Sequence, residues 1–210
     1  MTRLLWLAAA GAGLVLAADV PRVSYTKIFP GSDPAYMAIV VDQNGAVTYR
    51  EAKDEEPETF KLEAEPLQAI FDLAEKLGHF KRPLESGLKV AKTGDKTFRW
   101  ENGAESGEAK FNYSLDENAK LLQDWFERIS ESERALMNLR RAIRFDKLGV
   151  NDAVLRVDTA WSQKRLLGHA QFLPLLDRVA KNEGFVNIAR DRAARLADTL
   201  RAADSKVTVE

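Results

Sequence analysis

The stretch AYMAIVVDQNGAVTYREA, residues 35–52, carries the clearest structural signal of the chain. Its first half, 36–41, is apolar throughout and half β-branched or aromatic, which is typical of a strand covered on both faces. The Asn-Gly pair at 44–45 favours a tight turn. Val47 and Tyr49 then alternate with polar or small residues, as in a half-buried strand. The stretch predicts a β-hairpin, which needs further strands and a helix to be stable in water.

The sequence that follows predicts such strands and helices. Residues 63–77 repeat apolar side chains at helical spacing, with Pro66 in the first turn and Gly78 as the stop. A capping box at Ser114 and Glu117 opens a predicted helix over 115–147, and a second box at 130–133 leaves a break in that helix as an alternative. Further strands are predicted at 20–29 (an edge strand), 88–91, 97–100 and 110–113, with a turn at 93–95 and a loop at 102–107. Further helices are predicted at 152–167, 172–181 and 186–202.

These elements predict an α+β fold: an antiparallel sheet of two hairpins plus a short strand, with one covering helix, followed by an all-helical C-terminal part. The expected divisions are a signal peptide (1–18), a sheet domain (19–114), a long connecting helix (115–148), a helical subdomain (149–203) and a tail (204–210).

The N-terminus has the pattern of a secretory signal peptide. Arg3 precedes an apolar run over 4–16, and the small residues Ala17 and Ala18 offer two cleavage points. The alternative, an uncleaved anchor, is disfavoured because the run is shorter than the roughly 20 residues that span a bilayer. We therefore expect export to the periplasm or the medium, with no stable membrane span after cleavage. The absence of cysteine excludes disulfides and favours a bacterial envelope protein.

Composition argues against several classes of function. With a net charge of −1 and no basic stripe, the chain is not expected to bind nucleic acid. Two histidines, His79 and His169, without cysteine supply too few ligands for a zinc site. The sequence has no nucleophile elbow and no glycine-rich phosphate loop, so no cofactor and no catalytic residue are predicted. A triad that uses Ser32 remains an alternative, because triads depend on geometry and not on sequence order.

Two groups of side chains are candidate contacts for a ligand or partner. The first consists of aromatic residues on predicted strands: Tyr36, Tyr49, Phe98 and Trp100. They form a ligand platform if they point away from the helix, and core if they point towards it. The second is the basic side of the long helix, at Arg140, Arg141 and Arg144. It suits an acidic partner or lipid head groups, whereas a solvated face is the alternative.

The segment from the 29–32 sequence FPGS to Trp125-Phe126 resembles families of uncharacterised exported bacterial proteins. The shared pattern is a hairpin with an Asn-Gly or Asp-Gly turn, a helix ending near Phe80, a second hairpin and a closing helix. The resemblance implies an α+β core over about the first 110 mature residues and no catalytic residues. It does not extend past about Gly149.

The expected role is therefore a non-enzymatic envelope or secreted module that binds another protein. The alternatives are a small-molecule carrier or an envelope hydrolase, with a pocket between the sheet and the C-terminal helices, and a protein whose helical part serves self-association.

Overall fold

The structure is a computed structural model that describes residues 20–207, with side chains up to residue 203. The predicted signal peptide lies outside the described residues. The last helix continues to Val207, so the first four residues of the predicted tail are helical.

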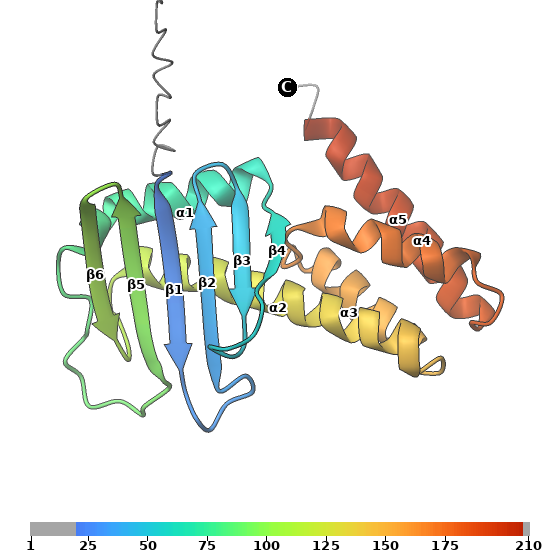
Figure 1. Ribbon diagram of the computed structural model, residues 1–210, viewed down its shortest axis with the longest axis horizontal. Coiled ribbons are helices and arrows are strands. Elements are labelled where there is room, and N and C mark those ends of the chain that lie inside the picture. Colours follow the sequence, from blue (N-terminus) through green and yellow to red (C-terminus); the bar gives the residue numbers. More distant parts are fainter. Residues whose placement is uncertain (1–19, 208–210) are drawn as a thin grey trace, which may run out of the picture.

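One six-stranded antiparallel sheet forms the N-terminal half of the protein (Figure 1). The strands are β1 (Arg22–Ile28), β2 (Tyr36–Asp42), β3 (Ala46–Arg50), β4 (Glu58–Lys61), β5 (Asp95–Asn102) and β6 (Glu105–Phe111). Their order across the sheet is β4-β3-β2-β1-β5-β6. The predicted hairpin is confirmed as β2 and β3. Its turn is held by Asp42 Oδ1, which accepts hydrogen bonds from the backbone N–H groups of Asn44 and Ala46, and by Gly45 at a φ of 85°.

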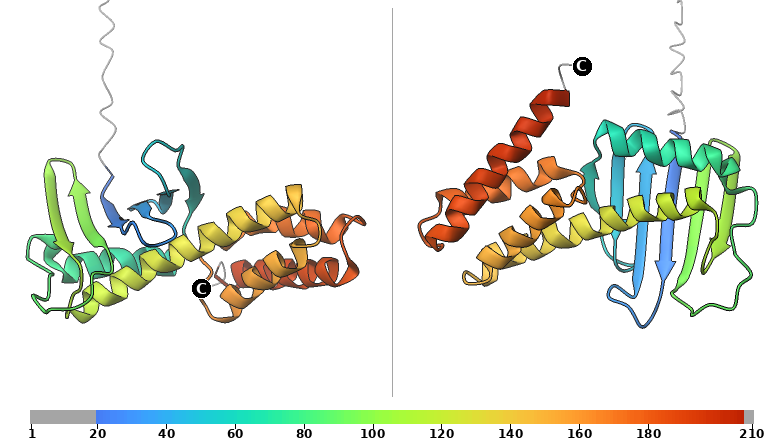
Figure 2. Two further views of the ribbon diagram at one scale, coloured as in Figure 1. Left: turned by 90° about the horizontal axis from the view of Figure 1, so that it is seen from below. Right: turned by 180° about the vertical axis from the view of Figure 1, so that it is seen from behind.

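The helices are α1 (Ala64–Lys76), α2 (Glu117–Phe145), α3 (Val150–Ser162), α4 (Leu173–Lys181) and α5 (Asn187–Val207). Two 3₁₀ turns, η1 (Gly78–Phe80) and η2 (His169–Phe172), follow α1 and precede α4. Helices α1 and α2 lie on the same face of the sheet, and no described helix lies on the opposite face (Figure 2). The predicted α+β class with a helical C-terminal part is therefore confirmed. None of the described helices is both long enough and apolar enough to cross a membrane.

Three strand predictions are wrong in detail. β1 is a central strand, because β2 and β5 pair with it on its two sides. Residues 88–91 form no strand, since β5 pairs instead with β6 across a turn at Gly103 (φ 56°). The loop predicted at 102–107 contains the start of β6. β4 was not predicted because its four residues, ETFK, are too few to show an alternating pattern, although Thr and Phe favour strands.

Helix α2 is continuous over 29 residues, as the first alternative predicted. Asp116, and not Ser114, is its N-cap, because the Asp116 carboxylate accepts hydrogen bonds from the N–H groups of Asn118 and Ala119. The second capping box does not act as a cap. Ser130 and Glu133 are both buried inside the helix, where they face other elements.

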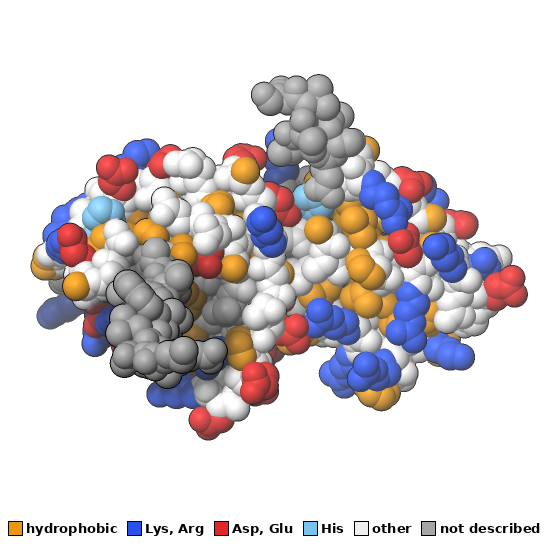
Figure 3. All heavy atoms as spheres, turned by 45° about the horizontal axis from the view of Figure 1, so that its top comes forward, with side chains coloured by type: hydrophobic (Ala, Val, Ile, Leu, Met, Phe, Trp, Pro, Cys, Tyr) orange, Lys and Arg blue, Asp and Glu red, His pale blue; other side chains and the backbone are white. Residues whose placement is uncertain are grey.

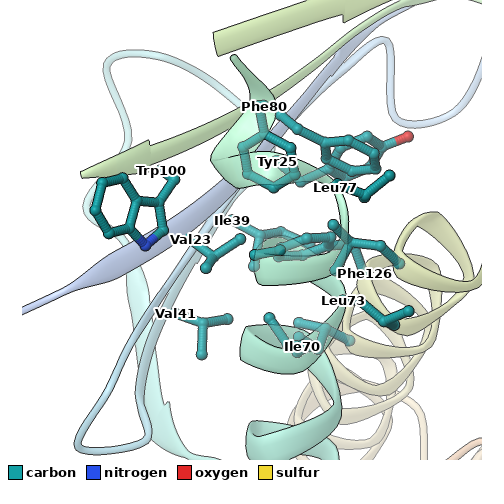
Figure 4. Close-up of a cluster of buried hydrophobic side chains, with 14 of the residues drawn as sticks. Val23, Tyr25, Ile39, Val41, Ile70, Leu73, Leu77, Phe80, Trp100 and Phe126 are labelled. Atoms are coloured by element: carbon teal, nitrogen blue, oxygen red, sulfur yellow. The ribbon is translucent and has the colours of Figure 1, made fainter. Parts of the chain in front are cut away.

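Two hydrophobic cores share this one helix. The N-terminal half of α2 packs Leu122, Phe126 and Ile129 against the sheet and α1 (Figure 4). Its C-terminal half packs Leu136 and Leu139 against α3, α4 and α5. The chain therefore consists of a sheet subdomain and a helical subdomain that α2 joins without a break.

Successive helices of the helical subdomain run in opposite directions, so the loops that connect them lie at its two ends. Helix α2 runs outward from the sheet, α3 returns, α4 runs outward again and α5 returns (Figures 1 and 2). The α2–α3 and α4–α5 loops therefore lie together at the end farthest from the sheet. The connection from α3 to η2 lies at the junction with the sheet subdomain.

Candidate functional site

Two buried polar groups lie where the subdomains meet, a junction that we call the seam. Glu63, which precedes α1, extends its carboxylate to η2. It accepts hydrogen bonds from the backbone N–H groups of Gly168 (2.9 Å) and His169 (2.8 Å), and its Oε1 lies 2.6 Å from His169 Nδ1. Burial alone would raise the pKa of Glu63, but the hydrogen bonds from His169 and Gly168 hold it below its usual value.

Glu133 is the second buried group of the seam. Its side chain is fully buried on α2, and Oε1 accepts a hydrogen bond from Gln171 Nε2. Among the described residues Oε2 has no hydrogen-bond partner. Burial raises the pKa of Glu133 to about 7, and the nearby Glu58 carboxylate adds to the rise, while Gln171 and Arg140 oppose it.

A carboxyl that titrates near neutral pH is suited to acid–base catalysis, but a catalytic group must also reach a substrate. Two hollows on the described surface lie elsewhere. One, of about 300 Å³, lies between α2 and α3 around Glu131 and Thr159. The other, of about 280 Å³, lies at the end of β5 and β6. Neither hollow is lined by Glu63, Glu133 or His169, whereas Gln163 and Arg165 of the α3–η2 connection line the first. Glu133 and the Glu63–His169 pair act here as links between the subdomains.

Metal binding has no support in the described part of the chain. Residues 20–207 contain no group of three or more His, Asp or Glu side chains placed to hold a metal ion. His79 stacks on Trp100, with ring centroids 4.1 Å apart.

Of the two alternatives for the strand aromatics, a ligand platform or core, the structure shows core for three of the four residues. Tyr49, Phe98 and Trp100 all point towards α1 and α2 and are buried in the first core, so no ligand at the surface can stack on them. Tyr36 lies on the opposite face and is half-buried, with Lys53 Nζ 5.8 Å from its ring centre. Successive residues of a strand point to opposite faces of the sheet. In β2 the odd-numbered residues face the helices, so the even-numbered Tyr36 points to the opposite face.

The basic residues of α2 divide into two groups. Arg140 contributes to the seam, where its Nη1 lies 2.7 Å from Glu58 Oε2. Arg141 and Arg144 are exposed near the outer end of the helix and form no ion pair with a described residue. The sequence prediction therefore placed these two residues on an accessible surface but did not show what surrounds them.

Their surroundings are apolar. The outer end of the helical subdomain exposes four large hydrophobic side chains, which we call the distal tip: Phe145, Leu148, Val186 and Ile188. Phe145 is 76% exposed and Leu148 is 84% exposed, the two highest values among the large hydrophobic side chains described. The α2–α3 and α4–α5 loops that carry the tip touch, since Lys147 Nζ lies 3.7 Å from the position that a Cβ on Gly184 would take.

Charged side chains surround the distal tip. The cations are Arg141, Arg144, Lys147 and Lys181, which are exposed and form no ion pair with any side chain described. Two carboxylates lie among them. Asp146 accepts a hydrogen bond from the N–H of Gly149 through Oδ1, and Glu183 is exposed on the α4–α5 loop. Figure 3 shows Lys and Arg side chains beside exposed hydrophobic side chains over the helical subdomain.

Comparison with known proteins finds no relative. No protein-family model matches the chain. No curated protein has a similar sequence.

Sequence reasoning identified two cations of this site, Arg141 and Arg144, but missed its apolar members. Phe145 lies two residues past Ile143, outside the stripe that packs into the second core, and Leu148 follows the end of the helix. The available signal was a large apolar side chain near a helix end that does not lie on the buried face of the helix. Val186 and Ile188 could not be connected to it, because only the fold brings the two loops together.

Proposed function

We propose that this protein is an exported, non-enzymatic module that binds another protein through its distal tip. The observation that carries the proposal is the exposure of Phe145 and Leu148 at the end of α2, with Val186 and Ile188 also exposed at the neighbouring start of α5 (Figure 1). Clustered apolar side chains with a polar rim are typical of protein contact sites. Burial of an exposed Phe or Leu side chain contributes about 1.5–3 kcal/mol, so two such side chains supply much of a specific contact.

Burial of these side chains does not contribute to the stability of the folded protein. Phe145 and Leu148 lie outside both hydrophobic cores, and the second core is complete without them. Polar residues at the same positions would leave the buried contacts of α2 unchanged. Their apolar character is therefore better explained by a partner than by folding.

The rigid connection between the tip and the sheet subdomain supports the same role. Helix α2 continues from the sheet subdomain to the tip, and the seam ties η2 to Glu63 at a second point. A rigid mount reduces the conformational entropy that a contact surface loses on binding. The tip is therefore presented in a defined position relative to the sheet.

The mixed charge of the rim favours a protein partner over a lipid surface. Arg141 and Arg144 would attract anionic head groups, but Asp146 and Glu183 lie at the same end and would be driven into them. A partner protein with an apolar centre and an uneven, mainly acidic rim fits both signs of charge. The carrier or hydrolase alternative would require a pocket that opens onto the buried carboxyl groups of the seam, and neither of the two hollows is lined by Glu63 or Glu133.

Capture from the cells that produce the protein tests the proposal. The tagged chain is cross-linked in intact cells, and the captured proteins are quantified by mass spectrometry for the wild type and for Phe145→Ser/Leu148→Ser. The matched control is Leu121→Ser, because Leu121 is also an exposed leucine of α2 (55%) but lies at the sheet end.

We expect one protein to be recovered with the wild type and with the control, and to fall at least tenfold with the double variant. Recovery that does not depend on the tip residues would contradict the proposal. Circular dichroism of the purified variants confirms that each retains its fold.

A further inference from the structure

A pair of lysines faces the covered side of the sheet, near the end of β1 and the start of β5. Lys27 on β1 lies directly opposite Lys96 on β5 in the register of the two strands. Both side chains lie on the face that carries Tyr25 and Phe98, because directly paired residues share a face and alternate residues return to it. Like charges directly opposite one another destabilise an antiparallel pair, so the arrangement requires an explanation.

Lys96 is also the only lysine or arginine that is buried among the side chains described, with 4% exposure. Its Nζ donates hydrogen bonds to Asn112 O (2.6 Å) and to Thr93 Oγ1 (2.9 Å). Both acceptors are neutral, and no described carboxylate lies within ion-pair distance of Nζ. Lysine is rarely buried in this way without an anionic partner.

The acidic residues nearby are already engaged. Glu85 accepts hydrogen bonds from the N–H groups of Asn112 and Ser86, and Asp95 lies 3.0 Å from Lys92 Nζ. Glu85 and Glu127 favour the charged form of Lys96 only from a distance. Burial and the neighbouring Lys27 charge leave the pKa of Lys96 below its usual value.

A hollow of about 280 Å³ opens onto this lysine. Besides Lys96 it is lined by Thr97 and Lys110, which offer further donors, and by Phe111, Asn112, Glu85 and Asp95. Such a volume accommodates a small ligand. The hollow therefore combines a buried ammonium that pairs with no described carboxylate and space for a counter-ion, and Lys27 lies opposite that ammonium in the strand register.

We propose that the hollow at Lys96 binds a small oxyanion, of the phosphate or carboxylate class, with Lys96 as its cationic ligand and the facing Lys27 as a second positive charge beside that ligand. The anion supplies the negative charge that the facing lysines lack, and charge-assisted hydrogen bonds from an ammonium are the stronger kind. This site belongs to the sheet subdomain and is independent of the distal tip.

Isothermal titration calorimetry of the protein with sodium phosphate, and separately with sodium acetate, tests the proposal at ionic strength matched with sodium chloride. The variants are Lys96→Gln and Lys27→Gln, and Lys61→Gln serves as the control because Lys61 is an exposed lysine of the same sheet. Lys27→Gln keeps the test valid if Lys96→Gln does not fold, since Lys27 is only half-buried.

We expect saturable binding of at least one anion, weakened about tenfold or more by either lysine variant and unchanged by the control. Binding of phosphate alone or of acetate alone assigns the class. The absence of saturable heat with both anions would overturn the proposal, as would binding that survives Lys27→Gln unchanged.

Discussion

Replacement of Glu133 by glutamine is expected to remove a pH dependence from the stability of this protein. The pKa of the buried carboxyl rises from 4.5 to about 7 on folding, chiefly because burial disfavours the charged form. Between these values the folded chain holds a proton that the unfolded chain releases. The free energy of unfolding therefore falls as the pH rises from about 4.5 to about 7, and the loss is complete above that range.

The magnitude follows from the two pKa values. Their difference corresponds to at most about 3 kcal/mol, since each tenfold change in proton affinity is worth about 1.4 kcal/mol. Glutamine retains the oxygen that accepts the hydrogen bond of Gln171 and carries no charge at any pH. Glu133→Gln should therefore gain stability over the wild type mainly at high pH.

Urea unfolding at pH 5 and pH 8 measures this effect. We expect the gain of Glu133→Gln over the wild type to be about 2 kcal/mol larger at pH 8 than at pH 5. Glu75→Gln is the matched control, because Glu75 is an exposed glutamate of a helix on the same sheet face, and it should show no such difference. An equal gain for Glu133→Gln at the two pH values would refute the reasoning.

Two further substitutions test the packing of the sheet and the seam. Gly107→Ala should cost about 3 kcal/mol of stability, because the new Cβ would meet the carbonyl oxygen of His79. Gly103→Ala should cost only about 1 kcal/mol, because Gly103 has a positive φ but open space around it. Chemical denaturation measures both costs, and equal values for the two variants would contradict the prediction. Glu63→Gln should cost about 1.5–3 kcal/mol of stability at pH 7. A carboxylate whose pKa is lowered on folding stabilises the protein above its unfolded pKa and loses that effect as the pH falls, so the deficit of the variant should shrink below pH 4.5. Thermal unfolding from pH 3 to pH 7 measures the deficit, and a deficit that stays constant would contradict the prediction.

The parts of the fold that sequence reasoning predicted are those with local causes. The β2–β3 hairpin follows from an Asn-Gly turn between apolar runs, and the continuity of α2 follows from its heptad-spaced apolar residues. The pairing of β5 with β6 was missed because β6 reads ESGEAKF, with few β-formers and a glycine that serves a close backbone approach. Its strand character comes from its neighbours and not from its own composition.

The candidate sites were less accessible to sequence reasoning because they depend on distant contacts. The seam joins Glu63 to His169, which are 106 residues apart, and no periodicity reports such a contact. The facing of Lys27 and Lys96 depends on strand register. At the distal tip the cations Arg141 and Arg144 were found from the helix pattern, whereas the apolar residues came only from the meeting of two loops.

A photo-reactive amino acid at position 148 tests the proposed docking function most directly. Leu148 is exposed at the distal tip, so a benzophenone side chain there fits without disturbing the core, and the same substitution at Leu121 provides the control. Irradiation of intact cells should give one adduct of defined mass with a protein from position 148 and none from 121, and the adduct should disappear with Arg141→Glu/Arg144→Glu. Adducts only with lipid, no adduct at all, or an adduct that withstands the charge reversal would contradict the account.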